Sequence, residues 1–327
     1  MSSSIWMRAA GRLLLLVVVG LPMAWSVGYS LLYSVGAVGR LRSAATEGTA
    51  WQAAFAEPGL RRTAMYSAGV AAAATTLSVG LSLGIALAWP WLAASRLAQA
   101  SLGTLLATPP AVVGLLVLQW SSPGGFVARL ARRVGLIRVP QDFPTLVQDE
   151  WAIGLIAALA AVSAPVMTLS LLRLWTVARI DRHCELAEAL GATRSQARWH
   201  IALPMLWRRV RPLAALAFLA NLGAFELPLM LGQQSPEMIS VLIQRRFTHF
   251  DPAQRPRAFA LAVLYWLLVA IVLALWLRWQ RRQPWPSWQE WHGWQEWHGW
   301  RKNQRGQRSQ SSLLGQRGER TDERGSR

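Results

Sequence analysis

The residue types that usually perform catalysis are sparse in this chain. A single cysteine, Cys184, excludes an intramolecular disulfide and a cysteine zinc cluster. No paired carboxylates, metal-type histidine cluster or Ser-His-Asp set lies in or beside the apolar segments. The phosphate-binding pattern Gly-x4-Gly-Lys-Ser/Thr is also missing from the sequence, so the chain is not expected to hydrolyse ATP itself. We therefore expect no enzyme activity, no catalytic residue, no cofactor and no resident metal.

Two polar residues stand inside an otherwise apolar stretch. Asn221 and Glu226 interrupt the segment Leu213–Leu231. A carboxylate in a membrane is costly, which makes Glu226 a functional candidate. Glu226 lies toward the outer end of the segment, so a satisfied, water-exposed carboxylate is the alternative interpretation.

Composition indicates the environment of these residues. The 327 residues are 53% hydrophobic and only 15% charged, whereas soluble domains carry about 25% charged residues. The net charge is +18, which suits either nucleic acid or a membrane protein with arginine-rich cytoplasmic loops. The long apolar runs favour the membrane, so no nucleic-acid partner is expected.

Six segments are long and apolar enough to cross a bilayer core, which takes about 20 helical residues. Backbone groups in lipid must pair within their own segment, so we expect an all-α integral membrane protein. The arginine distribution favours an orientation with both termini in the cytoplasm. The first segment follows Arg8 and Arg12 as a signal peptide would, but its apolar run is too long, and we expect a retained helix. The predicted spans are Leu13–Leu32, Ala64–Pro90, Leu97–Gln119, Trp151–Leu172, Leu213–Leu231 and Ala258–Leu277.

The outer loop Ser121–Glu150 contains a short amphipathic pattern. Phe126, Leu130, Val134 and Ile137 recur at helical spacing with arginines between them. The pattern fits a helix on the outer membrane surface. A connecting helix packed on its neighbours fits equally well.

The tail after the last span has a different composition. Tryptophan recurs at every third residue from Trp285 to Trp300, and arginine, glutamine, glycine and serine dominate after that. The final part is expected to be disordered. The tryptophan repeat suits the membrane interface, where indole rings are favoured, and low-complexity duplication without a dedicated function is the alternative.

The loop Glu185–Pro204 has the clearest local structure signals. Good helix formers fill Asp181 to Leu190, and Gly191 suits a helix end. Thr193 and Gln196 have the spacing of a cap for a second short helix, and Pro204 suits the first turn of the next span. The resulting helix–turn–helix is apolar for a solvated loop, which calls for a partner.

This loop resembles the EAA loop of binding-protein-dependent ABC importer permeases. The family pattern is Glu-Ala-Ala, three residues, Gly, nine residues, Ile-x-Leu-Pro. Leu186 departs from it, standing where the family usually has alanine. The matching residues, at the family's spacing, are Glu185, Ala187, Gly191, Ile201, Leu203 and Pro204.

The resemblance implies a MetI-like permease with six transmembrane helices and a cytoplasmic coupling helix. In the family this helix inserts into a cleft on an ATPase subunit. Residues 63–279 would be the permease core with coupling loop 181–204. Residues 1–62 would add the first span and an outer loop, and residues 280–327 a cytoplasmic tail.

The resemblance also implies partners and a location. We expect a cytoplasmic ATPase dimer, a second permease unit, a periplasmic substrate-binding protein and membrane lipid, in the bacterial inner membrane. The second unit is either a copy of this chain or a separate chain.

Two further matches concern the solute. Thr108-Pro109-Pro110 is similar to a proline-containing turn in permeases for molybdate and other oxyanions, for iron, for thiamine and for polyamines. The stretch Phe225–Phe247 is most similar to the iron(III), polyamine and thiamine permeases. Prolines bend or unwind helices, so Pro109 and Pro110 are candidate pathway residues, together with the polar residues Asn221 and Glu226. The sequence does not decide which solute is transported.

Two other functions fit parts of the sequence. A secondary transporter or channel would use Glu226 as a proton or ion site and would need no ATPase. It leaves the loop match unexplained. A haem-handling membrane assembly protein is suggested only by His292 and His298 in the tryptophan-rich tail.

Overall fold

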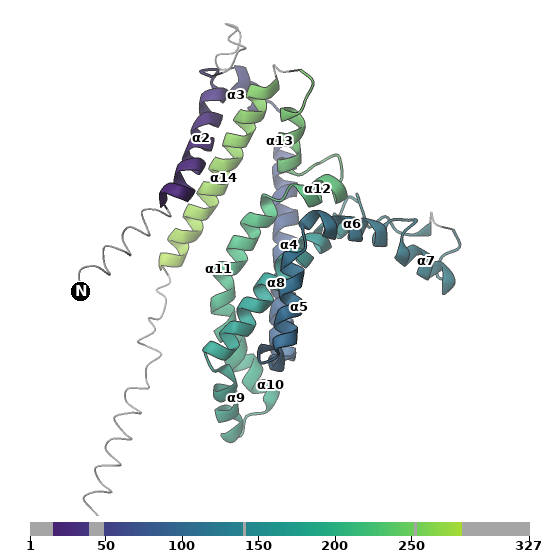
Figure 1. Ribbon diagram of the computed structural model, residues 1–327, viewed down its shortest axis with the longest axis vertical. Coiled ribbons are helices and arrows are strands. Elements are labelled where there is room, and N and C mark those ends of the chain that lie inside the picture. Colours follow the sequence, from purple (N-terminus) through teal and green to yellow (C-terminus); the bar gives the residue numbers. More distant parts are fainter. Residues whose placement is uncertain (1–15, 39–48, 140–141, 252–253, 283–327) are drawn as a thin grey trace, which may run out of the picture. The chain divides into compact units, whose positions relative to one another are not determined.

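The computed structural model describes residues 16–38, 49–139, 142–251 and 254–282 (Figure 1). Every regular element in these ranges is a helix. The chain divides into two compact units, Met1–Ala270 and Ile271–Arg327. The described part of the second unit is the C-terminal part of helix α14, from Ile271 to Arg282.

The longest helices are α4, α8, α11 and α14, and shorter helices precede or connect them. Their bounds are η1 Leu16–Gly20, α2 Leu21–Ser34, α3 Thr49–Phe55, α4 Leu60–Ala88, η2 Pro90–Ala93, α5 Arg96–Ala107, α6 Pro110–Ser121, α7 Phe126–Arg133, α8 Ile153–Val177, α9 Ile180–Ala189, α10 Arg194–Ala197, η4 Arg198–Ala202, α11 Leu203–Leu222, α12 Glu226–Leu231, α13 Ile239–Phe247 and α14 Arg255–Arg282.

Four stretches of the described residues have the length and composition of membrane spans: Leu60–Ala88, Pro110–Arg133, Ile153–Val177 and Arg255–Gln280. Three of them, α4, α8 and α14, coincide with predicted spans. The predicted first span falls on η1 and α2, apart from residues 13–15, which lie outside the described residues. The stretch Pro110–Arg133 contains a backbone break at residues 122–125 and is therefore two helices, α6 and α7.

Two predicted spans are not continuous helices. Leu97–Gln119 is divided into α5 and α6 because Thr108 and Pro109 are extended, with ψ of 122° and 139°. Each precedes a proline, whose ring disfavours the helical conformation in the residue before it. The prediction of one helix across Leu213–Leu231 is also wrong. Helix α11 ends at Leu222, and α12 starts only at Glu226.

The centre of the first unit is the packing of α4 on α8 and α11. Small residues let the backbones of α4 and α8 approach closely, as is common in membrane helix pairs. Ala71, Ala74 and Ala86 of α4 and Ala158 of α8 are fully buried.

Hydroxyl groups join the same helices. Ser78 Oγ and Ser163 Oγ of α8 lie 2.7 Å apart. Ser82 Oγ donates to the carbonyl of Ala164 at 3.1 Å and accepts from Thr168. Nearer the start of α4, Ser67 Oγ accepts the backbone N–H of Ile239 at 2.9 Å and so holds the start of α13. The long helices are thus joined by polar contacts as well as by close packing.

Candidate functional site

The connection between α8 and α11 folds as a compact helical hairpin. Helix α9 starts after Arg179, whose φ of 49° turns the chain sharply away from α8. It ends at Ala189, and Gly191 two residues later has a φ of +97°, the left-handed conformation that glycine adopts most easily. The N–H of Gly191 donates to the carbonyl of Glu188 and that of Ala192 to the carbonyl of Ala187, both at 3.0 Å. This double contact is a Schellman motif, and it closes the end of α9.

The second short helix, α10, carries the predicted cap. Gln196 N–H donates to Thr193 Oγ1 at 3.3 Å, and Thr193 N–H donates to Gln196 Oε1 at 2.9 Å. This reciprocal pair is a capping box and satisfies two N–H groups at the helix start. The sequence signals for the helix, the bend and the cap are therefore confirmed as local structure.

The inner side of the hairpin is anchored in the helix core. Ile180, Ala197, Ala202 and Leu206 are at most 1% exposed. They belong to one hydrophobic cluster with residues of α4 and α8, including Leu83, Leu171 and Trp175.

Cys184 also lies in this cluster, and its thiol contacts the carbonyl of Ala197 at 3.9 Å. Burial, followed by the charge of Glu188, raises the pKa of the Cys184 thiol. The cysteine is therefore packing material with low thiolate character at neutral pH.

The outer side of α9 is uncovered. Leu186 is 62% exposed and Leu190 is 83% exposed, and Glu185 beside them is exposed as well. Ala187 is partly buried and packs against the cluster beneath. Large apolar side chains on a solvent-facing helix are an unusual surface and suit a protein partner. The remaining predicted positions of the loop complete its bend and its re-entry. Gly191 and Pro204 are exposed, while Ile201 and Leu203 are half-buried.

A cavity of about 580 Å³ lies among α6, α8, α11 and α12. It brings together three of the four predicted pathway residues, Pro110, Asn221 and Glu226. Pro109 is not among its lining residues. Pro109 lies in the break between α5 and α6, directly before Pro110, the first residue of α6.

Most of the cavity wall is apolar, and two of its polar residues are turned into the helix core. Asn221 Nδ2 donates to Thr75 Oγ1 of α4 at 3.1 Å, and Ser163 contacts Ser78. Glu226 is exposed at the first turn of α12 and is the charged group among the described lining residues. The partner residues Thr75 and Ser78 were missed from the sequence. Their signal was the spacing of Ser67, Thr75, Ser78 and Ser82, which places hydroxyls on one face of α4.

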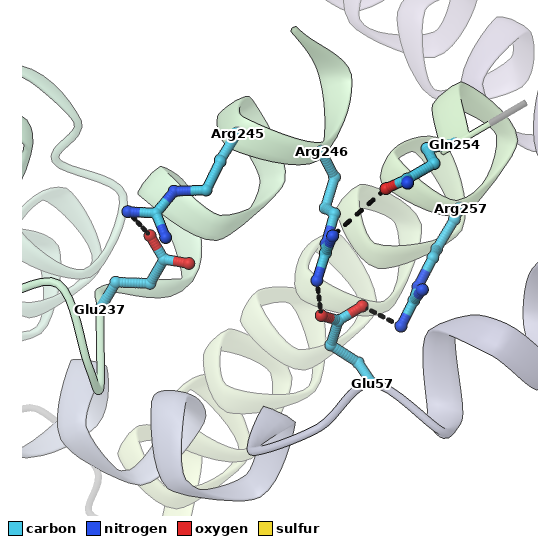
Figure 2. A network of polar contacts seen from close by, with 6 residues as sticks. All are labelled: Glu57, Glu237, Arg245, Arg246, Gln254 and Arg257. Atoms are coloured by element: carbon cyan, nitrogen blue, oxygen red, sulfur yellow. Dashed lines mark hydrogen bonds and ion pairs between the residues drawn. The ribbon is translucent and has the colours of Figure 1, made fainter. Parts of the chain in front are cut away.

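A second polar cluster was not anticipated at all. Figure 2 shows the Glu57 carboxylate, from the α3–α4 turn, between the guanidinium groups of Arg246 and Arg257. The Glu57 side chain is 2% exposed and those of the two arginines about a quarter. Arg246 also donates to Gln254 Oε1 at 3.2 Å. These contacts join the α3–α4 turn to α13 and α14.

Glu237 lies next to the same cluster. Its carboxylate pairs with Arg245 at 2.9 Å (Figure 2). Burial raises the pKa of the Glu237 carboxyl, and the charges of Arg245 and Arg246 oppose that rise. Helix α13 thus carries an ion pair on each of two neighbouring arginines.

Comparison with known proteins points to a single family. A family model described as "Binding-protein-dependent transport system inner membrane component" matches residues 80–283. The chain is 27% identical over 209 residues to the molybdenum transport system permease protein ModB of Azotobacter vinelandii. The aligned region covers 62% of this chain and 88% of that protein.

The fold is similar to that of a solved structure, a bacterial ABC transporter involved in the import of the acidic polysaccharide alginate. The TM-score is 0.56 and the sequence identity is 17%. The similarity covers 85% of this chain and 95% of that one. The family match extends over more than half of the chain and includes both the α8–α11 connection and the cavity. The chain therefore belongs to the binding-protein-dependent ABC importer permeases, the MetI-like inner membrane components of these transport systems.

Proposed function

We propose that this chain forms the pathway of its ABC importer and is driven by an ATPase dimer that docks on the loop Glu185–Pro204. The chain contributes no ATPase site of its own. In this proposal both termini and the loop face the cytoplasm, a periplasmic binding protein delivers a small solute, and a second permease unit completes the pathway.

The observation that carries the proposal is the two-sided character of α9. Its outer side presents Leu186 and Leu190, which are 62% and 83% exposed. Its inner side is fixed through Ile180 and Cys184 to the cluster that also contains residues of α4, α8 and α11. A helix that is apolar outside and rigidly mounted inside suits transmission of rigid-body motion from a docked partner to the spans.

Five of the six matched loop residues contact the partner or shape the loop in this proposal, and the sixth, Ala187, packs against the cluster beneath. Glu185 lies on the exposed side and would pair with a basic residue of the ATPase. Gly191 holds the bend that presents Leu190, and Ile201, Leu203 and Pro204 lead the chain back into α11. When closure of the ATPase dimer pulls on α9, the anchored cluster would carry that movement into α8 and α11.

The solute would pass along the cavity among α6, α8, α11 and α12. Pro110, Asn221 and Glu226 line it, and the α5–α6 break at Pro109 positions the α6 wall. Oxyanions are the first solute class to test, because the curated relative belongs to a molybdenum transport system. The proline turn in this chain also has counterparts in permeases of that class. Iron(III), thiamine and polyamines follow in the same uptake assay with their own binding proteins.

The docking is tested by two substitutions at one position. Leu186→Arg places a charge in the exposed apolar face, and we expect it to abolish co-purification of the ATPase and ATP-driven uptake in proteoliposomes. Leu186→Ala is the matched control. It restores the residue that the family usually carries, so we expect it to retain both. Because Leu186 is exposed, neither change should alter the folded chain, which size-exclusion chromatography checks.

The outcomes separate docking from other uses of the loop. Retention of the ATPase and of uptake by Leu186→Arg would contradict the docking role. Equal loss in both variants would show that the loop tolerates no change, which also contradicts a docking face that accepts alanine. Uptake driven by a proton gradient without any ATPase would favour a secondary transporter instead.

A further inference from the structure

Helix α7, Phe126–Arg133, has an apolar side that the described residues leave half exposed or more. Phe126 and Leu130 are 53% and 50% exposed, and Val134, directly after the helix, is 70% exposed. Residues four apart lie on the same side of a helix, so these three form one continuous strip. Ala128, on another side, is buried. The helix therefore rests on the protein through its small residue and turns its large ones outward.

The other exposed side of α7 is basic. Arg129, Arg132 and Arg133 are exposed and occupy one arc of the helix beside Phe126, with Arg132 farthest from Leu130. Within the described part of the chain these three arginines form no ion pair. Asp142, the nearest acidic residue in the sequence, accepts the backbone N–H groups of Arg138 and Val139 at 3.1 Å. The arginines thus have positive charge available for an external partner.

The direction of α7 is fixed by the turn that precedes it. Gly125 is buried, and a Cβ there would lie 2.5 Å from the carbonyl oxygen of Gln119 and 2.7 Å from that of Trp120. Only glycine fits this turn, and its N–H donates to the carbonyl of Ser122 at 2.8 Å. The rings of Trp120 and Phe126 lie 6.1 Å apart. The exposed strip is therefore held in place at the end of α6.

Tryptophans indicate where this end of α6 lies relative to the bilayer. Trp120 is 56% exposed at the end of α6, and Trp151 is 79% exposed just before α8. Indole rings concentrate at membrane interfaces. Helix α7 begins a few residues after Trp120, which places it at headgroup level.

We infer that α7 lies flat on the bilayer surface, with the Phe126–Leu130–Val134 strip in the acyl region and its arginines on anionic phospholipid headgroups. A helix with one apolar and one arginine-rich side has the composition of an interfacial helix. Each arginine near an anionic lipid surface adds to the electrostatic attraction. The exposed apolar strip and the arginines beside it favour a position on the membrane surface over packing of α7 on neighbouring helices. The inference does not depend on ATPase docking.

Spin-label accessibility in proteoliposomes of the full chain tests the inference. Cys184→Ala removes the single cysteine, and single cysteines are then placed at 126, 130 and 134, and at 129 and 132. We expect labels on the apolar strip to collide mainly with oxygen, and labels on the basic side mainly with a water-soluble nickel complex. Labels at Met65, an exposed residue of α4, and at Ser195 in α10 provide the lipid and water references.

Two results would overturn the membrane position. High nickel accessibility at all five sites would mean a solvated helix. Low accessibility to both reagents along the strip would mean that protein, such as a second copy of this chain, covers it.

The headgroup contact is tested separately with vesicle composition. With phosphatidylglycerol in the vesicles, we expect the label at 130 to lie deeper than in pure phosphatidylcholine. Replacing Arg129, Arg132 and Arg133 together by glutamine should remove that difference. An unchanged depth in both lipids, or a difference that survives the triple substitution, would contradict recognition of anionic headgroups.

Discussion

At the scale of single residues, Glu57 is the most consequential side chain outside the loop and the cavity. Its buried carboxylate pairs with two arginines from different helices, Arg246 and Arg257. Removing one member of a buried ion pair costs more than the pair itself contributes, because the remaining charges stay desolvated. Glu57 is therefore expected to hold the α3–α4 turn, α13 and α14 together.

Glu57→Gln tests this contact with almost no change in shape. We expect a loss of about 2 kcal/mol in stability, below the range for fully buried pairs because both arginines are partly exposed. The measurement is the thermal midpoint of the purified chain in detergent, which should fall by several degrees.

The matched control is Glu188→Gln. Glu188 pairs with Arg194 at 3.6 Å on the surface of the α8–α11 connection, and exposed pairs contribute at most about 1 kcal/mol. Equal thermal midpoints for both variants would mean that the Glu57 cluster contributes no more to stability than an exposed ion pair does.

At the scale of elements, the α4–α8 contact depends on small side chains. Ser78 is fully buried and contacts both Ala74 O and Ser163 Oγ at 2.7 Å. We expect Ser78→Leu to force the helices apart and cost about 3 kcal/mol, as overpacking of a dense core does. The thermal midpoint in detergent reports the change.

Ser78→Ala separates the effect of size from that of the hydroxyl. Ser163 keeps its contact with the carbonyl of Leu159 at 2.8 Å, so the loss should be about 1 kcal/mol, the usual net contribution of one hydrogen bond. If alanine proved as damaging as leucine, hydrogen bonding rather than close approach would hold the two helices.

The end of α9 allows a test of backbone conformation alone. A Cβ at Gly191 would meet no atom within 4 Å, so the cost of Gly191→Ala comes only from its φ of +97°. We expect a penalty of about 1–2 kcal/mol, a loosened loop, and weaker retention of the ATPase by an otherwise folded chain.

Gly84→Ala is the control for that change. Gly84 lies inside α4 with open space around its Cα, and alanine in a helix interior is favoured by about 0.5–1 kcal/mol. Weak ATPase retention by Gly84→Ala would point to a general effect of glycine replacement. Full retention by Gly191→Ala would mean that docking does not need a fixed bend.

Local signals in the sequence predicted the local structure of the loop well. Gly191, the Thr193–Gln196 cap and the helix before them depend on neighbours within a few residues, so their spacing is sufficient. The long apolar runs predicted α4, α8 and α14 for the same reason, since a bilayer span is a property of one continuous segment. The docking role of the loop stays a prediction.

Features that depend on distant residues were not accessible in this way. No proline marks the break between α11 and α12 at Gly223, whereas Pro109 marks the break between α5 and α6. The hydroxyl of Tyr265 in α14 lies 3.3 Å from where a Cβ at residue 223 would be. Glu57 and Arg246 are 189 residues apart, and nothing near either one indicates its partner. The cavity likewise combines residues from four helices whose packing no local pattern specifies.

At the scale of the whole molecule, the features that carry the proposed function lie between the α3–α4 turn and the first turns of α14. The family match ends at residue 283, and the predicted tryptophan repeat and basic tail lie beyond the described residues. The loop Glu185–Pro204, the described cavity lining and the Glu57 cluster all precede that tail. A chain ending at residue 283 should therefore keep the same thermal midpoint, the same ATPase co-purification and the same uptake rate as the full chain. The comparison uses both chains in the same proteoliposomes, with Leu186→Arg as the inactive reference. Loss of uptake with the midpoint and ATPase retention unchanged would instead assign the repeat from Trp285 to Trp300 a role in transport.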